Sequence, residues 1–137
     1  MNDRIFIDTN ILVYAYTTGS IEKYEKAKTF LQNSKAVYVL STQVLNEFYV
    51  NLGKYKIEHD KIVTAISEIT TICEIQPVKV ETVNMALTIR KRYGFSYWDS
   101  LILSAALENL CSLLYSEDMS DGQIIEDKLQ IVNPFNE

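Results

Sequence analysis

Short apolar runs alternate along this chain with stretches of helical periodicity, and this alternation limits the folds open to it. The runs lie at residues 4–7, 36–40, 75–78, 112–115 and 129–132. They are rich in β-branched or aromatic residues, and the run at 36–40 is continuously apolar, which is typical of a strand covered on both faces. Strands that alternate with helices predict an α/β fold with a central parallel sheet flanked by helices. Pro77 favours an edge position for the run at 75–78.

Six stretches between these runs have the apolar spacing of helices. They span 11–16, 21–32, a segment after residues 41 and 42 that carries Leu45, Phe48, Tyr49 and Leu52, and then 58–73, 83–93 and 96–110. Ser41 and Thr42 have side chains suited to capping a helix, and Gly94 is suited to ending one. The helix at 96–110 is apolar nearly all round, which predicts a central position buried on both sides.

Length and composition predict one domain, spanning 1–137, with its own core: the 137 residues are 47% hydrophobic and 23% charged. Cys73 and Cys111 lack the spacing of a zinc site, and their apolar surroundings favour buried thiols in a reducing compartment. No segment has the pattern of a signal peptide or a membrane span, so we expect a cytoplasmic protein without membrane contact. The net charge of −5 argues against a general basic surface for nucleic acid, although it is compatible with a local basic path.

Four acidic residues stand where predicted elements begin or end. Asp8 follows the first strand and Asp118 follows the strand at 112–115, while Glu47 and Asp99 lie in helices that reach the same edge. In open α/β folds the working groups gather at the carboxyl ends of the strands, so the four carboxylates can converge. Clustered carboxylates repel one another and need a cation at neutral pH, and an all-oxygen ligand set favours Mg²⁺ or Mn²⁺. We therefore predict a metal site.

Each acidic residue also has a purely structural interpretation. Asp8 could cap the helix that follows it, and Ser96-x-x-Asp99 has the pattern of a capping box. Glu47 could be a solvated side chain, and Asp118 could belong to a turn. Taken singly, these structural roles explain most of the acids at least as well as catalysis does. The ordered set favours the metal site.

Four segments carry a resemblance to a known family: Phe6-Ile7-Asp8-Thr9-Asn10, Asn46-Glu47-Phe48, Tyr97-Trp98-Asp99-Ser100-Leu101-Ile102 and Tyr115-Ser116-Glu117-Asp118-Met119. In this order and spacing they resemble the PIN domain family over essentially the whole chain. Within it the chain is most similar to the VapC-like toxins of type II toxin–antitoxin modules. The resemblance implies a PIN-like fold, a metal-dependent endoribonuclease, an RNA substrate, a cognate antitoxin and, as for many members, a homodimer.

The resemblance also assigns roles to single residues. The family's four acidic site positions are matched by Asp8, Glu47, Asp99 and Asp118. Polar positions near the metal are matched by Thr9, Asn10 and Ser116, and the resemblance implies Asp121, on the same loop as Asp118, as an accessory metal ligand after Asp118. Because Mg²⁺ keeps several waters and takes few carboxylates, we expect Asp8 and Asp99 to be direct ligands. Glu47 and Asp118 would then act through water or hold a second ion.

Carboxylate-held ions can activate a water, neutralise phosphate charge and assist the leaving oxygen in phosphodiester hydrolysis. In-line attack by water would leave a 5′ phosphate and a 3′ hydroxyl. His59 is the only histidine, which argues against ribonuclease chemistry based on paired histidines. The candidates for binding RNA backbone are the basic residues Lys54, Lys56, Arg90, Lys91 and Arg92. The last three would equally well complement a helix C-terminus.

Other classes of function fit the sequence less well. The alternative is a non-catalytic PIN-like adaptor that binds RNA or protein, and intact acids at all four positions argue against it. A phospho-acceptor receiver domain needs an aspartate after a mid-chain strand and a lysine after a late one, and this chain has neither in place. A phosphatase with an aspartate nucleophile needs a DxD-type start, whereas this chain has Asp8-Thr9-Asn10.

Overall fold

The computed structural model describes residues 3–33 and 35–136 of the chain. The helices are α1 (Thr9–Tyr14), α2 (Ile21–Leu31), α3 (Thr42–Lys54), α4 (His59–Ile72), α5 (Val80–Tyr93) and α6 (Tyr97–Glu108). The strands are β1 (Asp3–Ile7), β2 (Ala36–Ser41), β3 (Glu74–Gln76), β4 (Leu113–Tyr115), β5 (Ile124–Ile125) and β6 (Leu129–Val132). The α/β architecture predicted from the alternation of runs is confirmed.

The strands form one sheet in the order β3-β2-β1-β4-β6-β5. Neighbouring strands are parallel except for β5 and β6, which pair antiparallel. β3 lies at an edge of the sheet, as predicted, but it spans Glu74–Gln76 and ends before Pro77, which the predicted run at 75–78 included. The sequence pattern does not predict β5, because two residues are too few to show a period.

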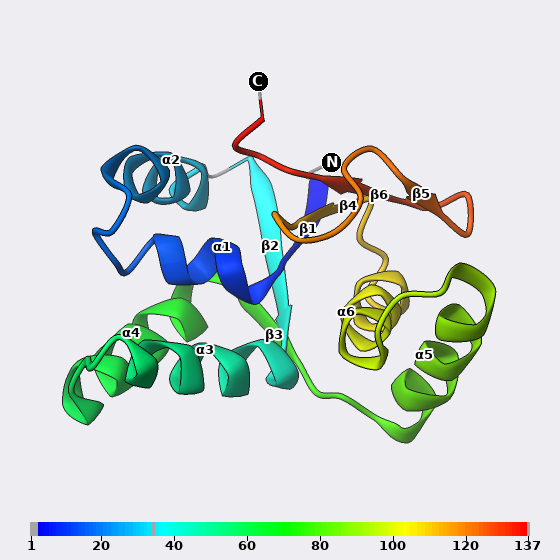
Figure 1. Cartoon of the computed structure of the whole chain (residues 1–137), viewed down its shortest axis with the longest axis horizontal. Coiled ribbons are helices and arrows are strands. Elements are labelled where there is room, and N and C mark those ends of the chain that lie inside the picture. Colours follow the sequence, from blue (N-terminus) through cyan, green and yellow to red (C-terminus); the bar gives the residue numbers. More distant parts are fainter. Residues whose placement is uncertain (1–2, 34, 137) are drawn as a thin grey trace.

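The direction in which the chain crosses the sheet decides which face each helix covers. From β1 to β3 the chain moves toward one edge, and it then returns past β2 and β1 to reach β4. Crossovers between parallel strands are right-handed, so the reversal puts the helices of the return crossover on the opposite face. Accordingly, α1 to α4 lie on one side of the sheet and α5 and α6 on the other (Figure 1).

Helix α6 is buried as its all-round apolar pattern predicts. Residues 100–106 are buried without interruption, because the helix packs against α5 and lies beside β2 of the sheet (Figure 1). Gly94 ends α5 in the left-handed conformation, with φ at 79°, which a residue without a Cβ adopts most easily. Cys73 and Cys111 are buried free thiols, as expected. No helix in the described residues is long and apolar enough to cross a membrane.

Two predictions about helix starts are wrong in detail. α5 begins at Val80, three residues before the predicted start, because the Thr82 hydroxyl accepts the N–H of the residue preceding the helix at 3.0 Å. Ser41 stands at the N-terminus of α3, but its side chain makes no capping hydrogen bond. The Thr42 hydroxyl instead accepts a hydrogen bond from the Val78 N–H at 3.2 Å. It thereby ties the start of α3 to the segment after β3.

Candidate metal centre

Asp8 and Asp118 lie just after two adjacent parallel strands, β1 and β4, at the point where the strand order reverses. Asp8 directly follows β1, and its N–H donates to the Tyr115 carbonyl at the end of β4 at 2.9 Å. Asp118 lies on the loop that follows Tyr115. Open α/β folds bind their ligands at such a switch point, outside the carboxyl ends of the strands.

Glu47 and Asp99 reach the same place from two helices. Glu47 lies in the second turn of α3, directly after β2, and Asp99 lies in the first turn of α6. All four acids line one pocket of about 700 Å³. The structure therefore brings together the four acidic residues that the sequence singled out.

Asp8 is the most buried of these acids, with 7% of its surface exposed. One carboxylate oxygen accepts the Thr9 N–H at 2.7 Å, which caps α1, and the other accepts the Ser116 hydroxyl at 2.7 Å. Burial raises the pKa of Asp8 to about 6; the bonds from Ser116 and Thr9 oppose that rise, and the charges of Asp99 and Glu47 add to it. The Asp8 carboxylate is therefore destabilised as an anion, which a nearby cation would relieve. Capping and metal binding are compatible roles for it.

Glu47 is held by side chains from two elements. Its Oε1 accepts the Thr9 hydroxyl at 2.7 Å, and its Oε2 accepts Nε2 of Gln43 at 3.2 Å. Nε2 of Gln43 also donates to the Trp98 carbonyl at 3.1 Å, so this amide ties α3 to the first turn of α6. The sequence analysis gave Gln43 no role, although it stands one helical turn before Glu47 and so on the same face.

Asp99 lies in the first turn of α6, where the charges of neighbouring acids act on it. The Ser96 hydroxyl accepts the Asp99 N–H at 3.1 Å and so caps α6, in agreement with the capping pattern. Burial raises the pKa of Asp99, a hydrogen bond from Ser96 lowers it in part, and the charges of Asp118 and Glu47 raise it further. Since its charge also raises the pKa of Asp8, Asp99 is electrostatically coupled to all three other acids.

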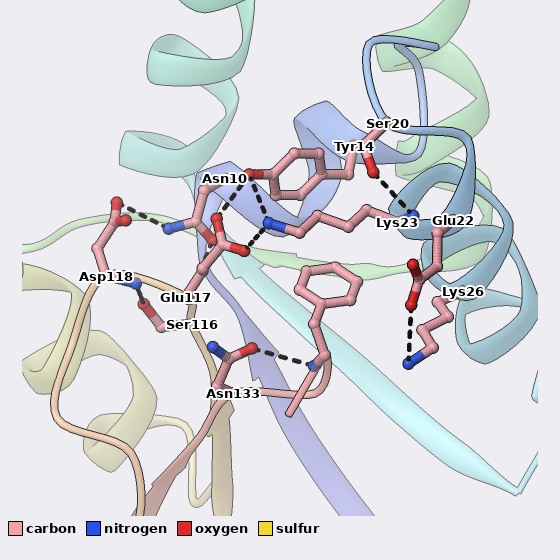
Figure 2. A network of polar contacts seen from close by, with 11 residues as sticks. Asn10, Tyr14, Ser20, Glu22, Lys23, Lys26, Ser116, Glu117, Asp118 and Asn133 are labelled. Atoms are coloured by element: carbon pink, nitrogen blue, oxygen red, sulfur yellow. Dashed lines mark hydrogen bonds and ion pairs between the residues drawn. The ribbon is translucent and has the colours of Figure 1, made fainter. Parts of the chain in front are cut away.

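Asp118 is exposed and held by Asn10 and Ser116. Its Oδ2 accepts Nδ2 of Asn10 at 2.9 Å, and its N–H donates to the Ser116 hydroxyl at 3.3 Å. Oδ1 of Asn10 accepts the Glu117 N–H at 3.4 Å, so Asn10 holds this loop at two points (Figure 2). The predicted polar positions near the metal, Thr9, Asn10 and Ser116, are thus each bonded to one of the four carboxylates.

The part of the chain that forms this site matches a known family. The model of the PIN domain family matches residues 5–120, which include all four acids. This chain belongs to the PIN domain family. No curated protein sequence matches it.

Several solved structures share this PIN fold. VapC20 from Mycobacterium tuberculosis, a sarcin-ricin loop cleaving toxin, is 20% identical with a TM-score of 0.70, over 83% of this chain and 89% of that one. A toxin–antitoxin complex from Klebsiella pneumoniae is 21% identical with a TM-score of 0.71, over 96% and 98%. FitAcB from Neisseria gonorrhoeae is 17% identical with a TM-score of 0.65, over 96% and 99%. These likenesses confirm the predicted PIN-like fold.

The other two acids on the loop after β4 of this PIN domain face other partners. Glu117 forms an ion pair with Lys23 of α2 and accepts the Tyr14 hydroxyl at 2.6 Å (Figure 2). Asp121 accepts the backbone N–H of Asn133 at 2.8 Å. Neither residue lines the pocket, whereas Asp118 does. The geometry thus separates Asp118 from Asp121, which the sequence placed on the loop as an accessory ligand.

The predicted RNA-binding cations of the PIN domain lie in two regions. Lys54, at the end of α3, lines a second hollow of about 340 Å³. Asn10 and Asn51 line both this hollow and the acidic pocket, so the two adjoin. Lys56 is exposed in the turn just beyond Lys54. The cluster of basic residues at 90–92 forms the last turn of α5 and lines neither hollow. Within it, Arg90 donates to the Phe95 carbonyl at 2.7 Å, and Arg92 pairs with Glu126.

The donor set of the PIN pocket fits a hard divalent cation. The polar residues among those that line it offer carboxylate, hydroxyl and amide oxygens, which Mg²⁺ and Mn²⁺ prefer. Among residues 3–33 and 35–136, no three Asp, Glu, His or Cys side chains are placed so that they could hold an ion together as they stand. An ion here would take one or two carboxylates and keep several waters, which is the habit of Mg²⁺.

Proposed function

We propose that this PIN domain is a Mg²⁺- or Mn²⁺-dependent endoribonuclease that hydrolyses RNA phosphodiester bonds. The environment of Asp8 carries the proposal. Its carboxylate is buried, its pKa is raised to about 6, and the charges of two further acids contribute to that rise. A cluster of this kind favours a divalent ion at neutral pH, and phosphodiester hydrolysis is a reaction that carboxylate-held ions support.

The proposed roles follow the burial and the hydrogen bonds of the four acids. Asp8 and Asp99 would bind the ion directly, because burial and neighbouring charge raise both pKa values. Glu47 and Asp118 would orient the waters of that ion or hold a second one. When bound, the ion would neutralise phosphate charge and activate a water.

The neutral side chains of the site would fix the direction of each carboxylate. The Thr9 hydroxyl holds Glu47, the Ser116 hydroxyl holds Asp8, and the Asn10 amide holds Asp118. Loss of a group that orients a metal ligand in this way commonly lowers metal affinity or activity by roughly 10- to 100-fold. Each of them comes from the first turn of α1 or from the loop after β4, so the same two segments would position the reacting phosphate.

We further propose that the enzyme is the toxin of a type II toxin–antitoxin pair, restrained by a cognate antitoxin protein. The support is the likeness in fold to the toxin–antitoxin complex from Klebsiella pneumoniae, over 96% of this chain and 98% of that one. Assembly as a homodimer stays a prediction of the family resemblance. Sedimentation of the purified chain would test it.

The decisive experiment is cleavage of a mixed cellular RNA pool by the purified chain with Mg²⁺, with Mn²⁺ and with a chelator. An Asp99→Asn variant keeps the shape of the side chain and removes its charge. Asp127→Asn is the matched control, because Asp127 is exposed and does not line the pocket. We expect metal-dependent cleavage with 5′ phosphate ends, lost in Asp99→Asn and kept in Asp127→Asn.

Two outcomes would count against the proposal. Cleavage that persists in the chelator would remove the metal from the mechanism. A folded protein that binds RNA but cuts nothing with either ion would favour the non-catalytic adaptor.

A further inference from the structure

The pocket is larger than its proposed metal chemistry requires. It has a volume of about 700 Å³. An ion with six waters fills roughly 200 Å³, at about 30 Å³ per water. The remaining space is of the size that small organic ligands occupy in proteins.

The lining of this remaining space is neutral. Six residues of α3 line the pocket: Thr42 at the start of the helix and, at helical spacing along one face, Gln43, Asn46, Glu47, Val50 and Asn51. Only Glu47 among them is charged. Past Glu47 the α3 face offers one apolar side chain, Val50, and the amide of Asn51, which suit an uncharged planar group better than a second ion.

Trp98 stands at the same pocket and is largely uncovered. Trp98 is one of the residues that line the pocket, and 61% of its surface is exposed, while Val50 of the α3 face is 54% exposed. An exposed indole beside a polar site often marks an interaction surface, because covering it with another group releases apolar area from water.

The structure also holds Trp98 in place before any ligand arrives. The Tyr97 ring packs edge-on against the indole, with ring centroids 5.1 Å apart. The Trp98 carbonyl accepts Nε2 of Gln43 at 3.1 Å, the same amide that holds Glu47. The Trp98 backbone is therefore tied to the side chain that holds Glu47, the Tyr97 ring lies against the indole, and Asp99 is the next residue in the chain.

We propose that Trp98 is a stacking platform for one unpaired nucleobase of the RNA, with Val50 and the amides of the α3 face around the base. The inference rests on the proposed ribonuclease function and adds to it a residue that selects the substrate. A base stacked on Trp98 would place an adjoining phosphate near Asp99. Stacking needs a base free of its partner strand, so the site would select single-stranded segments and loops.

Tryptophan fluorescence tests this directly, because Trp98 is the only tryptophan in the chain. Asp8→Asn protein would be titrated with a single-stranded oligoribonucleotide, since this variant is expected not to cut it. The controls are a duplex of the same sequence and a single strand in which abasic sites replace the bases. We expect quenching by the intact single strand alone. Equal quenching by the abasic strand, or none by any strand, would overturn the stacking platform.

Kinetics of single-strand cleavage give the second measurement. Trp98→Ala should raise KM by about five-fold or more, the factor that corresponds to about 1 kcal/mol of base stacking, and change kcat less. Trp98→Phe should restore most of the loss, because it keeps an aromatic face. Leu87→Ala is the matched control, since Leu87 is an exposed apolar residue of α5 that does not line the pocket. Circular dichroism would verify that each variant is folded.

The two proposals fail in different ways. If the wild type cuts RNA with metal while Trp98→Ala has an unchanged KM and fluorescence does not respond, the stacking platform is wrong and the ribonuclease stands. If intact single strands quench Trp98 but no metal permits cleavage, the platform stands and the ribonuclease is wrong. If Trp98→Ala converts a dimer to a monomer and leaves RNA binding unchanged, Trp98 belongs to an interface between copies, which overturns the platform.

Discussion

The Thr9 hydroxyl donates a 2.7 Å hydrogen bond to Glu47 and so joins the start of α1 to the second turn of α3. Thr9 is buried and directly follows Asp8, so one dipeptide contributes a proposed ligand and holds a second carboxylate. Gln43 holds the other oxygen of Glu47. The site is therefore a hydrogen-bonded framework in which few side chains act alone.

Replacing Thr9 with valine should separate orientation from charge. Thr9→Val keeps the shape of the side chain and removes the donor. The charged Glu47 carboxylate then loses one of its hydrogen bonds. We expect the cleavage rate to fall roughly 10-fold or more, with the fold retained. Thr88→Val is the control, because Thr88 is an exposed threonine of α5. An undiminished rate in Thr9→Val would show that Glu47 needs no orientation from this residue.

Removing the charge of Asp8 should stabilise the metal-free protein. In the folded chain the pKa of Asp8 is about 6, above its ordinary value of 3.8. Between these pH values the folded state binds more protons, so the free energy of unfolding falls as the pH rises from about 4 to about 6. At pH 7 Asp8→Asn should raise that free energy by up to about 3 kcal/mol. Urea unfolding with a chelator, at pH 4 and at pH 7, would measure the change; equal stability of the two proteins at pH 7 would contradict it.

A divalent ion should reverse that difference. An ion that binds only the folded state stabilises it by about 2.7 kcal/mol when its concentration is 100 times the dissociation constant. We expect Mg²⁺ or Mn²⁺ to raise the melting temperature of the wild type and to change that of Asp8→Asn much less. NaCl at the same ionic strength controls for general screening. Equal shifts in both proteins would mean that the ion binds away from Asp8.

The ion pair between Lys23 and Glu117 should support the loop that carries Asp118. Lys23→Met keeps most of the stem and removes the charge, leaving Glu117 with only the Tyr14 hydroxyl (Figure 2). We expect the activity to fall a few-fold. The free energy of unfolding should fall by at most about 1 kcal/mol, because the pair is partly exposed. Lys26→Met is the matched control, since its pair with Glu22 spans 3.9 Å on the surface of the same helix. Equal effects of the two variants would exclude a special role for Lys23.

The two groups of basic residues should behave differently toward RNA. Lys54→Ala should weaken RNA binding and reduce the dependence of log K on log salt by about 1, because Lys54 lies beside the acidic pocket. Arg92→Ala should leave RNA binding unchanged, since that guanidinium already pairs with Glu126. Filter binding at several salt concentrations would show which group contacts RNA. A salt slope reduced by Arg92→Ala and not by Lys54→Ala would reverse the assignment.

The sequence predicted the architecture well because the fold depends on long regular patterns. The continuous apolar run at 36–40 and the all-round apolar helix at 96–110 both correspond to buried elements. The pattern does not predict β5, because Ile124 and Ile125 form a strand only by pairing with β6. Pairing of this kind is tertiary information.

The site shows the same division between pattern and packing. The four acids could be found because each stands at the end or the start of a predicted element. Gln43 and Trp98 could not be assigned a role, because their importance lies in contacts between α3 and α6. The capping role of Ser41 was wrong for a related reason: its hydroxyl is buried and has no hydrogen-bond partner among the described residues.

The Asp8 N–H bonds to the Tyr115 carbonyl, so the centre of the sheet closes only when β4 pairs with β1. A chain still being synthesised has β1, β2 and β3 long before it has β4, and it lacks Ser116 and Asp118 until that point. The proposed ribonuclease could therefore not cut RNA while it is being translated, until β4 and the loop after it have emerged. The order of the strands along the chain would thus delay the activity until most of the protein has been synthesised.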